Sequence, residues 1–157
     1  MELRIKQRVF SWADAYDVFD ENGNARYFVK GKVFSIGHQI HVYEKESGRE
    51  VGSIHQELLS ILPKFHIVIE GHNVGTIKRE FTFFRPKYQV DFRGWVVEGD
   101  FMNWDYIAYQ GEREVLSVSK KLLSWGDTYT LQFSNPADEI MGLLLVLAID
   151  AVNSKNE

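Results

Sequence analysis

The chain of 157 residues contains no cysteine, only three prolines and no excess of basic residues. The lack of cysteine excludes disulfide scaffolds and thiolate metal sites, and it fits a reducing compartment. The net charge is −4, whereas a protein that holds nucleic acid by its phosphates usually carries a surplus of Lys and Arg. We therefore expect no nucleic-acid partner. Residues 1–8 alternate between polar and apolar instead of forming an apolar run, so we expect no signal peptide and a cytoplasmic location.

Readable catalytic and metal-binding motifs are also absent from the sequence. It has no Gly-x-Ser-x-Gly nucleophile elbow, no phosphate-binding loop and no dinucleotide fingerprint. Its histidines include His38 and His41, which stand three apart and would point to opposite faces of a strand. Zinc sites usually need three or four convergent ligands. We therefore expect no metal, no cofactor and no enzymatic activity, and we interpret the histidines as exposed residues of strands.

The residues that are present favour β-strands joined by tight turns. Aromatic residues make up 14% of the chain, and aromatic and β-branched residues are enriched in strands. The pair Asn22-Gly23, between segments 16–19 and 26–29, predicts a hairpin, since this pair adopts the positive φ angles of a tight turn. Segments 40–43 and 50–54 are joined by a turn that contains glycine and predict a second hairpin.

An internal repeat extends this pattern over most of the chain. Segments 51–69, 74–92 and 115–133 each show a long strand, a turn and a returning strand. In the returning strands apolar residues alternate with their neighbours, as in Tyr88 and Val90, which predicts one face on a core and one on water. We count about a dozen strands, and antiparallel sheets of that size tend to curl or close.

The last part of the chain predicts a single apolar helix. Asn135 followed by Pro136 and by acidic residues is typical of a helix start. Residues 140–149 then contain no polar side chain. A helix that is apolar on every side lies in a core or in a membrane, and this run is shorter than a membrane span, which needs roughly 20 residues. We therefore expect one domain over residues 1–157 and no transmembrane span. Its fold class is mostly β: an antiparallel closed β-barrel of about twelve strands around a buried C-terminal hydrophobic helix.

Several short motifs and the terminal helix occur together in a specific order along the chain. Besides the helix, the motifs are Lys6-Gln7, Phe10-Ser11, residues 16–31, Phe34-Ser35-Ile36-Gly37, Leu58-Leu59-Ser60 and residues 80–88. Together they resemble one known family, the LURP-one-related proteins, in its bacterial branch. The resemblance implies a tubby C-terminal-like fold, a β-barrel around a central hydrophobic helix, in agreement with the patterns above. It also suggests a role, since tubby proteins bind phosphoinositides in membranes, but no residue here matches the tubby lipid-binding motif.

Basic residues near the repeats are candidates for binding lipid head groups: Lys78, Arg79, Arg85, Lys87, Lys120 and Lys121. Each such residue near a charged membrane adds about 1 kcal/mol, so we expect a non-enzymatic module that binds anionic phospholipid and is peripheral to the membrane. The alternative for these residues is a solvated strand edge, where lysines block edge pairing. The alternative for the protein is an intracellular scaffold that binds a protein partner. A small-ligand carrier is disfavoured, because the helix is expected to fill the barrel.

One pattern conflicts with this fold. Gln56, Arg79 and Lys120 each stand between two apolar residues of a strand, so a regular strand would point them into the barrel. A buried unpaired charge is costly, and we favour a β-bulge or a strand that leaves the barrel wall at these positions. If the three side chains instead converge on a cavity, that cavity is the best candidate site.

Overall fold

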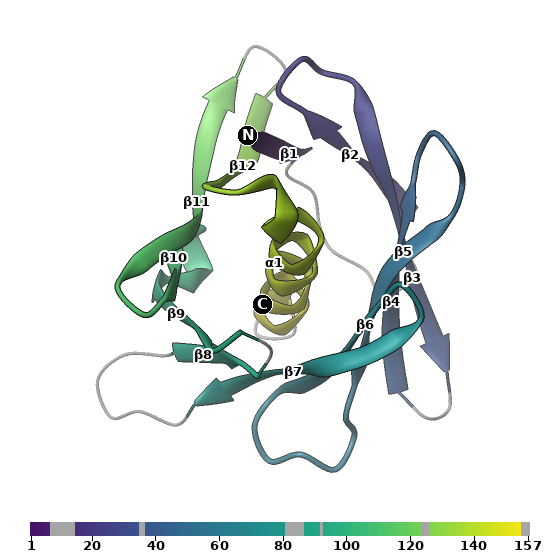
Figure 1. Cartoon of the computed structure of the whole chain (residues 1–157), viewed down its shortest axis with the longest axis vertical. Coiled ribbons are helices and arrows are strands. Elements are labelled where there is room, and N and C mark those ends of the chain that lie inside the picture. The colour runs from purple at the N-terminus through teal and green to yellow at the C-terminus, as the bar shows by residue number, and fades with distance from the viewer. Residues whose placement is uncertain (7–14, 35–36, 81–86, 92, 124–125, 155–157) are drawn as a thin grey trace.

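Within the residues that the structure describes, twelve antiparallel strands form a closed barrel around one helix, as the computed structural model shows (Figure 1). The structure describes residues 1–6, 15–34, 37–80, 87–91, 93–123 and 126–154. The strands are β1 (Glu2–Lys6), β2 (Ala15–Asp20), β3 (Ala25–Phe34), β4 (Gly37–Glu44), β5 (Glu50–Gln56), β6 (Lys64–Ile69), β7 (His72–Glu80), β8 (Lys87–Val90), β9 (Trp95–Asp100), β10 (Asp105–Gln110), β11 (Arg113–Leu123) and β12 (Gly126–Phe133). The short 3-10 helix η1 (Phe101–Asn103) joins β9 to β10, and η2 (Pro136–Asp138) leads into helix α1 (Glu139–Ser154).

The order of the strands around the barrel follows their order in the sequence. Each strand pairs with the one before it and the one after it, and β1 closes the barrel by pairing with β12. All of these pairings are antiparallel, so hairpin connections suffice for the whole wall. The predicted fold class, a closed antiparallel barrel around a C-terminal helix, is confirmed.

The hairpin of β2 and β3 shows how the sequence sets these turns. Gly23 has a φ angle of +85°, a conformation that glycine adopts without steric cost. The Oδ1 atom of Asp20 accepts hydrogen bonds from the backbone N–H groups of Asn22 and Asn24, both at 2.9 Å. The hairpin predicted from the Asn22-Gly23 pair is therefore confirmed.

The register of the strands divides the wall into an inner and an outer face. Ile54 pairs with Ile67, Ile77 pairs with Val90, and all four side chains are completely buried on the inner face. The adjacent position on β7, Lys78, is exposed on the outer face. This alternation follows from the period of two along a strand, and it places the core inside the barrel.

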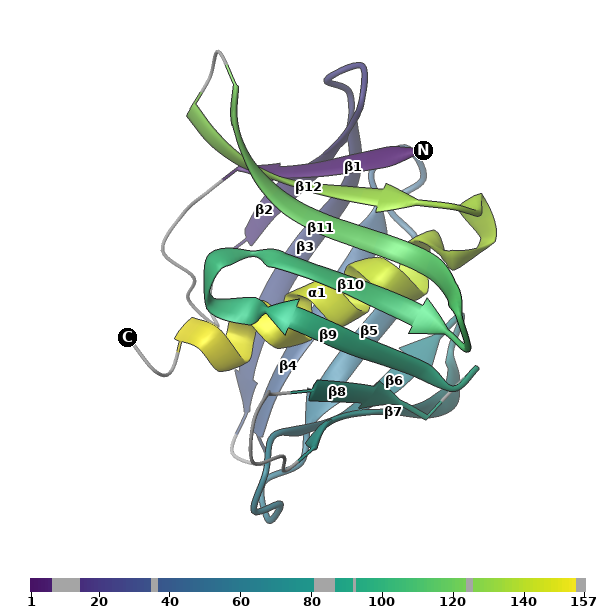
Figure 2. The ribbon, with the colours of Figure 1, turned by 90° about the vertical axis from the view of Figure 1, so that its left-hand side faces the viewer.

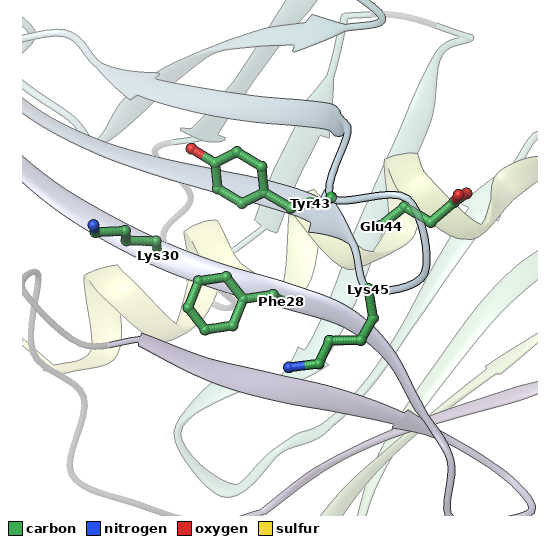
Figure 3. Close-up of a pocket in the computed structure, with 6 residues that line it drawn as sticks. Phe28, Lys30, Tyr43, Glu44 and Lys45 are labelled. Atoms are coloured by element: carbon green, nitrogen blue, oxygen red, sulfur yellow. The ribbon is translucent and has the colours of Figure 1, made fainter.

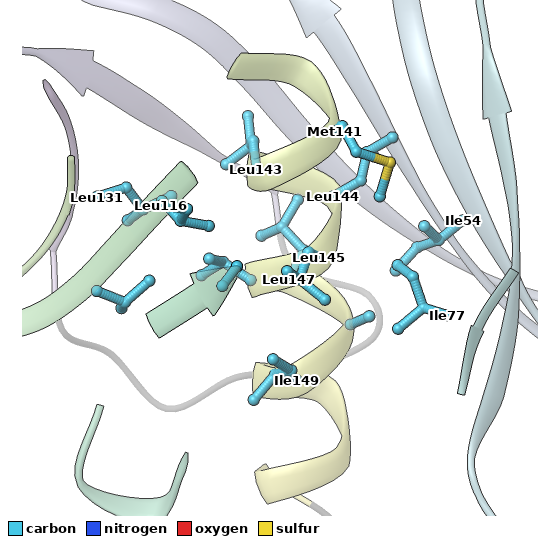
Figure 4. Close-up of a cluster of buried hydrophobic side chains, with 14 of the residues drawn as sticks. Ile54, Ile77, Leu116, Leu131, Met141, Leu143, Leu144, Leu145, Leu147 and Ile149 are labelled. Atoms are coloured by element: carbon cyan, nitrogen blue, oxygen red, sulfur yellow. The ribbon is translucent and has the colours of Figure 1, made fainter. Parts of the chain in front are cut away.

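Helix α1 fills the interior of the barrel (Figures 1 and 2). Residues 141–149 are all buried, and Figure 4 shows Leu116 and Leu131 on one side of the helix and Ile54 and Ile77 on the other. The predicted start is confirmed in part: the side chain of Asn135 accepts a hydrogen bond from the backbone N–H of Ala137 at 3.0 Å. Residues 136–138 form the 3-10 turn η2 first, and α1 begins after it. Among the helices of the described residues, none is both long enough and apolar enough to cross a membrane.

Two glycines allow α1 to approach the wall closely. A Cβ atom on Gly142 would lie 2.3 Å from a ring carbon of Phe133, and one on Gly52 would lie 3.0 Å from a methyl group of Leu144. The first distance is far shorter than a van der Waals contact, so the helix and β12 can be this close only because Gly142 has no side chain.

Both ends of α1 are fixed to the barrel by polar contacts. At its start, Arg93 donates a hydrogen bond to the buried carboxylate of Asp138 at 2.5 Å, and Glu139 pairs with Arg26. At its end, the Asn153 amide donates to the backbone carbonyl of Phe101 at 2.7 Å. The position of α1 along the barrel axis is therefore set at both ends.

Candidate functional site

The two ends of the barrel differ in their connections (Figure 2). We call the end at which α1 begins the start end; it carries the short turns after β2, β4, β6 and β10. We call the end at which α1 finishes the exit end; it carries residues 57–63 between β5 and β6, and η1 between β9 and β10. The polar residues that conflicted with the expected fold all lie near the exit end.

Gln56, Arg79 and Lys120 lie at inward positions of their strands. Each of these strands does carry one register shift, at Val51, Val74 and Val115, but the shift lies five residues before the polar side chain. The β-bulge expected at the polar positions themselves is therefore wrong, because the pairing there runs without a shift. Gln56 and Arg79 are half-buried and Lys120 is exposed, so all three reach solvent at the mouth of the barrel. Their cross-strand partners are buried aromatic residues: Phe65, Tyr88 and Tyr129.

Gln56 has a hydrogen-bond partner at its position, and Arg79 has a buried tyrosine beside it. The side-chain oxygen of Gln56 lies 3.1 Å from Nδ1 of His38, within hydrogen-bond distance. Arg79 lies beside Tyr88: burial raises the pKa of Tyr88 to about 12, and the positive charge of Arg79 opposes that rise. Gln56 thus has a hydrogen-bond partner, and Arg79 is only half-buried and reaches solvent, so neither strand has to leave the wall to avoid a buried unpaired polar group.

A groove with a volume of about 680 Å³ lies at the exit end, between the 57–63 connection and strands β7 and β8. Arg79 is one of its lining residues, and basic side chains outnumber acidic ones by three to one. We call it the rim groove, and its lining residues are Leu59, Ser60, Ile61, Leu62, Lys64, Lys78, Arg79, Glu80 and Gln89.

Apolar side chains project into solvent beside the rim groove. Leu59 is 96% exposed and Ile61 is 100% exposed, and Leu58 follows at 58%. Met102 in η1, at the same end of the barrel, is 53% exposed. Among the described residues, these are all the large apolar side chains that are more than half exposed. An exposed apolar patch rimmed by polar residues is typical of a protein or membrane interaction site.

The connection that carries Leu59 and Ile61 is braced from within. The backbone N–H of Glu57 donates to the carbonyl of Lys64 at 2.9 Å, which closes the base of the connection. The Glu57 carboxylate lies 3.4 Å from the ammonium group of Lys64. The hydroxyl of Ser60 donates to the carbonyl of Leu62 at 2.6 Å. These contacts hold the two apolar side chains outward.

The candidate basic residues are divided between several places. Lys78 and Arg79 line the rim groove, with Lys78 exposed on the outer face and Arg79 half-buried on the inner side. Lys87 pairs with Glu98 across β8 and β9 at 3.0 Å. Lys120 and Lys121 are exposed on β11, which β8, β9 and β10 separate from β7, and Arg85 lies outside the described residues.

Sequence reasoning missed Lys64, the third basic residue of the rim groove. Lys64 on β6 is the direct cross-strand partner of Lys78 on β7. The signal was present in the sequence, since a hairpin of segments 64–69 and 72–80 around Gly71 brings these two positions together. Because Lys64 and Lys78 are neighbours, both place positive charge at the rim groove.

The ion pairs of the barrel leave the positive charge of Lys78 uncompensated. Within the described part of the chain Lys78 forms no ion pair, although Lys64 is paired with Glu57. Four basic residues near the start end, by contrast, are paired with carboxylates, whereas Arg113 there donates to the side chain of Gln110. The four pairs are Arg26 with Glu139, Lys45 with Asp17, Arg49 with Glu70 and Arg93 with Asp138. The rim groove is thus positively charged locally, in a protein whose net charge is −4.

Three of the five histidines, His41, His55 and His66, form a row on the outer face. The expectation of exposed histidines is wrong for these three and for His38, which are half-buried, and holds for His72. The rings of His41 and His55 lie 5.8 Å apart between centroids, and His55 pairs in register with His66. Burial, and then the neighbouring His41, lower the pKa of His55. His38 lies on the inner side of β4 and His41 on the outer side, as their spacing predicts. No group of three or more His, Asp or Glu residues in the described ranges is placed to hold a metal ion.

The fold and the exit end define a class: a closed antiparallel β-barrel that is filled by its own C-terminal helix and carries a basic, apolar rim. The sequence matches the LURP-one-related family over residues 1–150, and the chain belongs to this family. It is 34% identical over 157 residues to the uncharacterized protein YxjI of Bacillus subtilis (strain 168), an alignment that covers 100% of this chain and 96% of that protein. No solved structure matches the chain. The resemblance inferred from the sequence is confirmed, and a bacterial relative agrees with the predicted branch.

Proposed function

We propose that the protein is a non-enzymatic binding module whose exit end docks on the surface of an anionic membrane. One observation carries the proposal: Leu59 and Ile61, both almost fully exposed, project from a groove that Lys78 and Arg79 line. Apolar side chains that enter the interface, beside cations that meet head groups, are the two ingredients of peripheral membrane binding.

The apolar side chains supply the first part of the binding free energy. Burying a Leu or Ile side chain fully is worth roughly 1.5–3 kcal/mol. Leu59 and Ile61 start almost fully exposed, so nearly all of that gain is available on insertion. The braced connection of residues 57–63 presents both side chains without further ordering, which reduces the entropic cost of binding.

The cations supply the second part and make the binding selective for negative charge. A Lys or Arg near an anionic membrane surface adds about 1 kcal/mol. Lys64, Lys78 and Arg79 lie together beside the apolar side chains. Because the Debye length at physiological ionic strength is about 8 Å, salt should weaken this part of the binding and leave the apolar part.

The distribution of acidic residues favours one orientation on the membrane. Exposed carboxylates lie in the turns of the start end, at Glu21, Glu46, Glu70 and Glu112. An anionic surface would repel these carboxylates; at the exit end it would attract the basic rim groove and repel Asp100 and Asp105, which are exposed on either side of η1. The overall charge of −4 therefore does not oppose docking, since the local charge at the contact is what matters.

Vesicle flotation tests the proposal. Vesicles of phosphatidylcholine mixed with phosphatidylglycerol are expected to carry the protein to the top of a density gradient at low salt, and high salt should reduce the floating fraction. The double variant Lys78→Gln/Arg79→Gln and the variant Ile61→Ser are each expected to lose most of it. Arg113→Gln, which removes a positive charge near the start end, is the matched control and should float like the wild type.

Two results would overturn the proposal. One is the absence of flotation with these vesicles at low salt, and the other is equal flotation of the rim variants and the wild type. A protein partner that binds through the exit end, with no vesicle association, would favour the alternative scaffold role.

A further inference from the structure

A second groove, independent of the rim groove, lies on the outer face of β3 and β4 (Figure 3). Its volume is about 460 Å³, within the range of roughly 300–1,000 Å³ that is typical of small-molecule sites. We call it the aromatic groove; its lining residues are Phe28, Lys30, Tyr43, Glu44, Lys45 and Gly48.

Two aromatic rings form the floor of the aromatic groove. Phe28 and Tyr43 are direct cross-strand partners on the outer face. Their ring centroids lie 6.3 Å apart with an angle of 41° between the ring planes. The rings are therefore tilted toward each other rather than stacked, and a flat ring could contact the faces or edges of both.

Two ammonium groups flank this floor. The Nζ atom of Lys45 lies 5.5 Å from the centroid of Phe28 and 3.1 Å from a carboxylate oxygen of Asp17. Lys30 follows Phe28 on the same face of β3, is exposed, and forms no ion pair with another described residue. Figure 3 shows the two lysine side chains on either side of the Phe28 ring, while the carboxylate of Glu44 points away from it.

We propose that the aromatic groove binds a small planar aromatic anion, such as an aromatic carboxylate. The ligand ring packs against Phe28 and Tyr43, and its anionic group lies within reach of Lys30 and Lys45. A flat ring matches the aromatic floor. Of the two ammonium groups, that of Lys45 already interacts with the carboxylate of Asp17, so one further negative charge on the ligand balances the remaining positive charge. Hydrogen bonds between ammonium and carboxylate groups are stronger than neutral ones, so the charge of the ligand should dominate its selection.

Titration of the amide chemical shifts by NMR, with naphthoate and its uncharged amide as probes, tests this proposal. Naphthoate is expected to shift the backbone amide signals of residues 28, 43 and 48 saturably. The probe in which an uncharged carboxamide replaces the carboxylate should bind about tenfold more weakly, which corresponds to about 1.4 kcal/mol in binding free energy. The exposed variant Lys30→Gln should weaken naphthoate binding several-fold while leaving the fold intact. Asp17→Asn should strengthen it, because that change releases Lys45 from its carboxylate.

The control is Lys121→Gln, which removes an exposed lysine from β11, outside the aromatic groove, and should leave naphthoate binding unchanged. Equal affinities for naphthoate and its amide would overturn the proposal, and so would saturable shifts confined to other parts of the barrel. An absence of saturable shifts at solubility-limited probe concentrations would overturn it as well. None of these outcomes depends on vesicle binding, so the two proposals fail separately.

Discussion

Arg26 on β3 donates two hydrogen bonds to Glu139, the first residue of α1, from Nε to Oε1 at 2.5 Å and from Nη2 to Oε2 at 3.1 Å. The two residues stand 113 positions apart in the sequence. The Glu139 side chain is 5% exposed and the Arg26 side chain is 48% exposed. This bidentate pair ties the start of the central helix to the first hairpin of the wall.

The asymmetry in exposure predicts unequal effects of breaking the pair. Arg26→Gln leaves a buried carboxylate with fewer donors, which should lower the free energy of unfolding by about 1–3 kcal/mol. Glu139→Gln leaves an arginine that can still reach water, and we expect a smaller loss. Urea denaturation of both variants measures the difference. A larger loss for Glu139→Gln than for Arg26→Gln would contradict this account of the pair.

The close approach of α1 to β12 predicts the effect of adding one methyl group. In Gly142→Ala the new Cβ would lie 2.3 Å from a ring carbon of Phe133, and overpacking of a core costs about 1–3 kcal/mol. The better helix propensity of alanine, about 1 kcal/mol, offsets only part of that cost. We expect a lower melting temperature for Gly142→Ala.

The double variant tests whether the ring of Phe133 is the cause. In a Phe133→Leu background the ring carbon is absent, so Gly142→Ala should cost much less than it does in the wild type. Calorimetry of the four proteins in this cycle measures the coupling. Additive effects of the two substitutions would show that some other contact limits the space at residue 142.

A matched pair of leucine substitutions separates the core from the rim. Leu145→Ala removes a completely buried side chain from the central helix and should destabilise the protein by about 2–5 kcal/mol. Leu59→Ala removes an exposed side chain and should change the stability by less than about 0.5 kcal/mol. It should nevertheless reduce flotation with anionic vesicles. A stability loss for Leu59→Ala as large as that for Leu145→Ala would mean that the 57–63 connection belongs to the core.

The buried tyrosines predict a loss of stability at high pH. Burial raises the pKa values of Tyr27, Tyr88 and Tyr106 above the usual value of about 10, to about 12 for Tyr88. In this range the folded protein binds more protons than the unfolded chain, so its stability is fully present below pH 10 and is lost as the pH rises through 12.

Absorbance of tyrosinate as a function of pH measures this directly. We expect a fraction of the tyrosines to ionise only together with alkaline unfolding, and Tyr88→Phe should reduce that late fraction. An early, reversible ionisation of all tyrosines in the folded protein would contradict the burial of these side chains.

Much of the wall could be predicted from the sequence, because alternation along a strand reports directly on burial. Ile77 and Val90 follow that rule and are buried. Arg79 does not follow it, and a bulge expected at Arg79 was wrong because the register shift of β7 lies nearer the start of the strand, at Val74. The side chain points inward by register and still reaches solvent, since Arg79 lies near the end of β7 and lines the rim groove.

The parts that could not be predicted depend on contacts between distant residues. The pairing of Arg26 with Glu139 requires the closed barrel and the threaded helix together, and no local pattern marks it. The rim groove depends on how residues 57–63 fold back beside β7, which neither periodicity nor turn chemistry specifies. The contact of Lys64 with Lys78 was accessible in principle through the register of one hairpin.

The insertion of residue 61 into the membrane interface tests the central functional claim most directly. The chain has no cysteine, so Ile61→Cys provides a single site for an environment-sensitive fluorophore, and Glu112→Cys provides the control at the start end. With vesicles of phosphatidylcholine and phosphatidylglycerol, we predict that the label at residue 61 shifts its emission to the blue and is quenched by spin-labelled acyl chains, while the label at residue 112 does not change. A label at residue 61 that stays in water on vesicles that have bound the protein would contradict docking through the exit end.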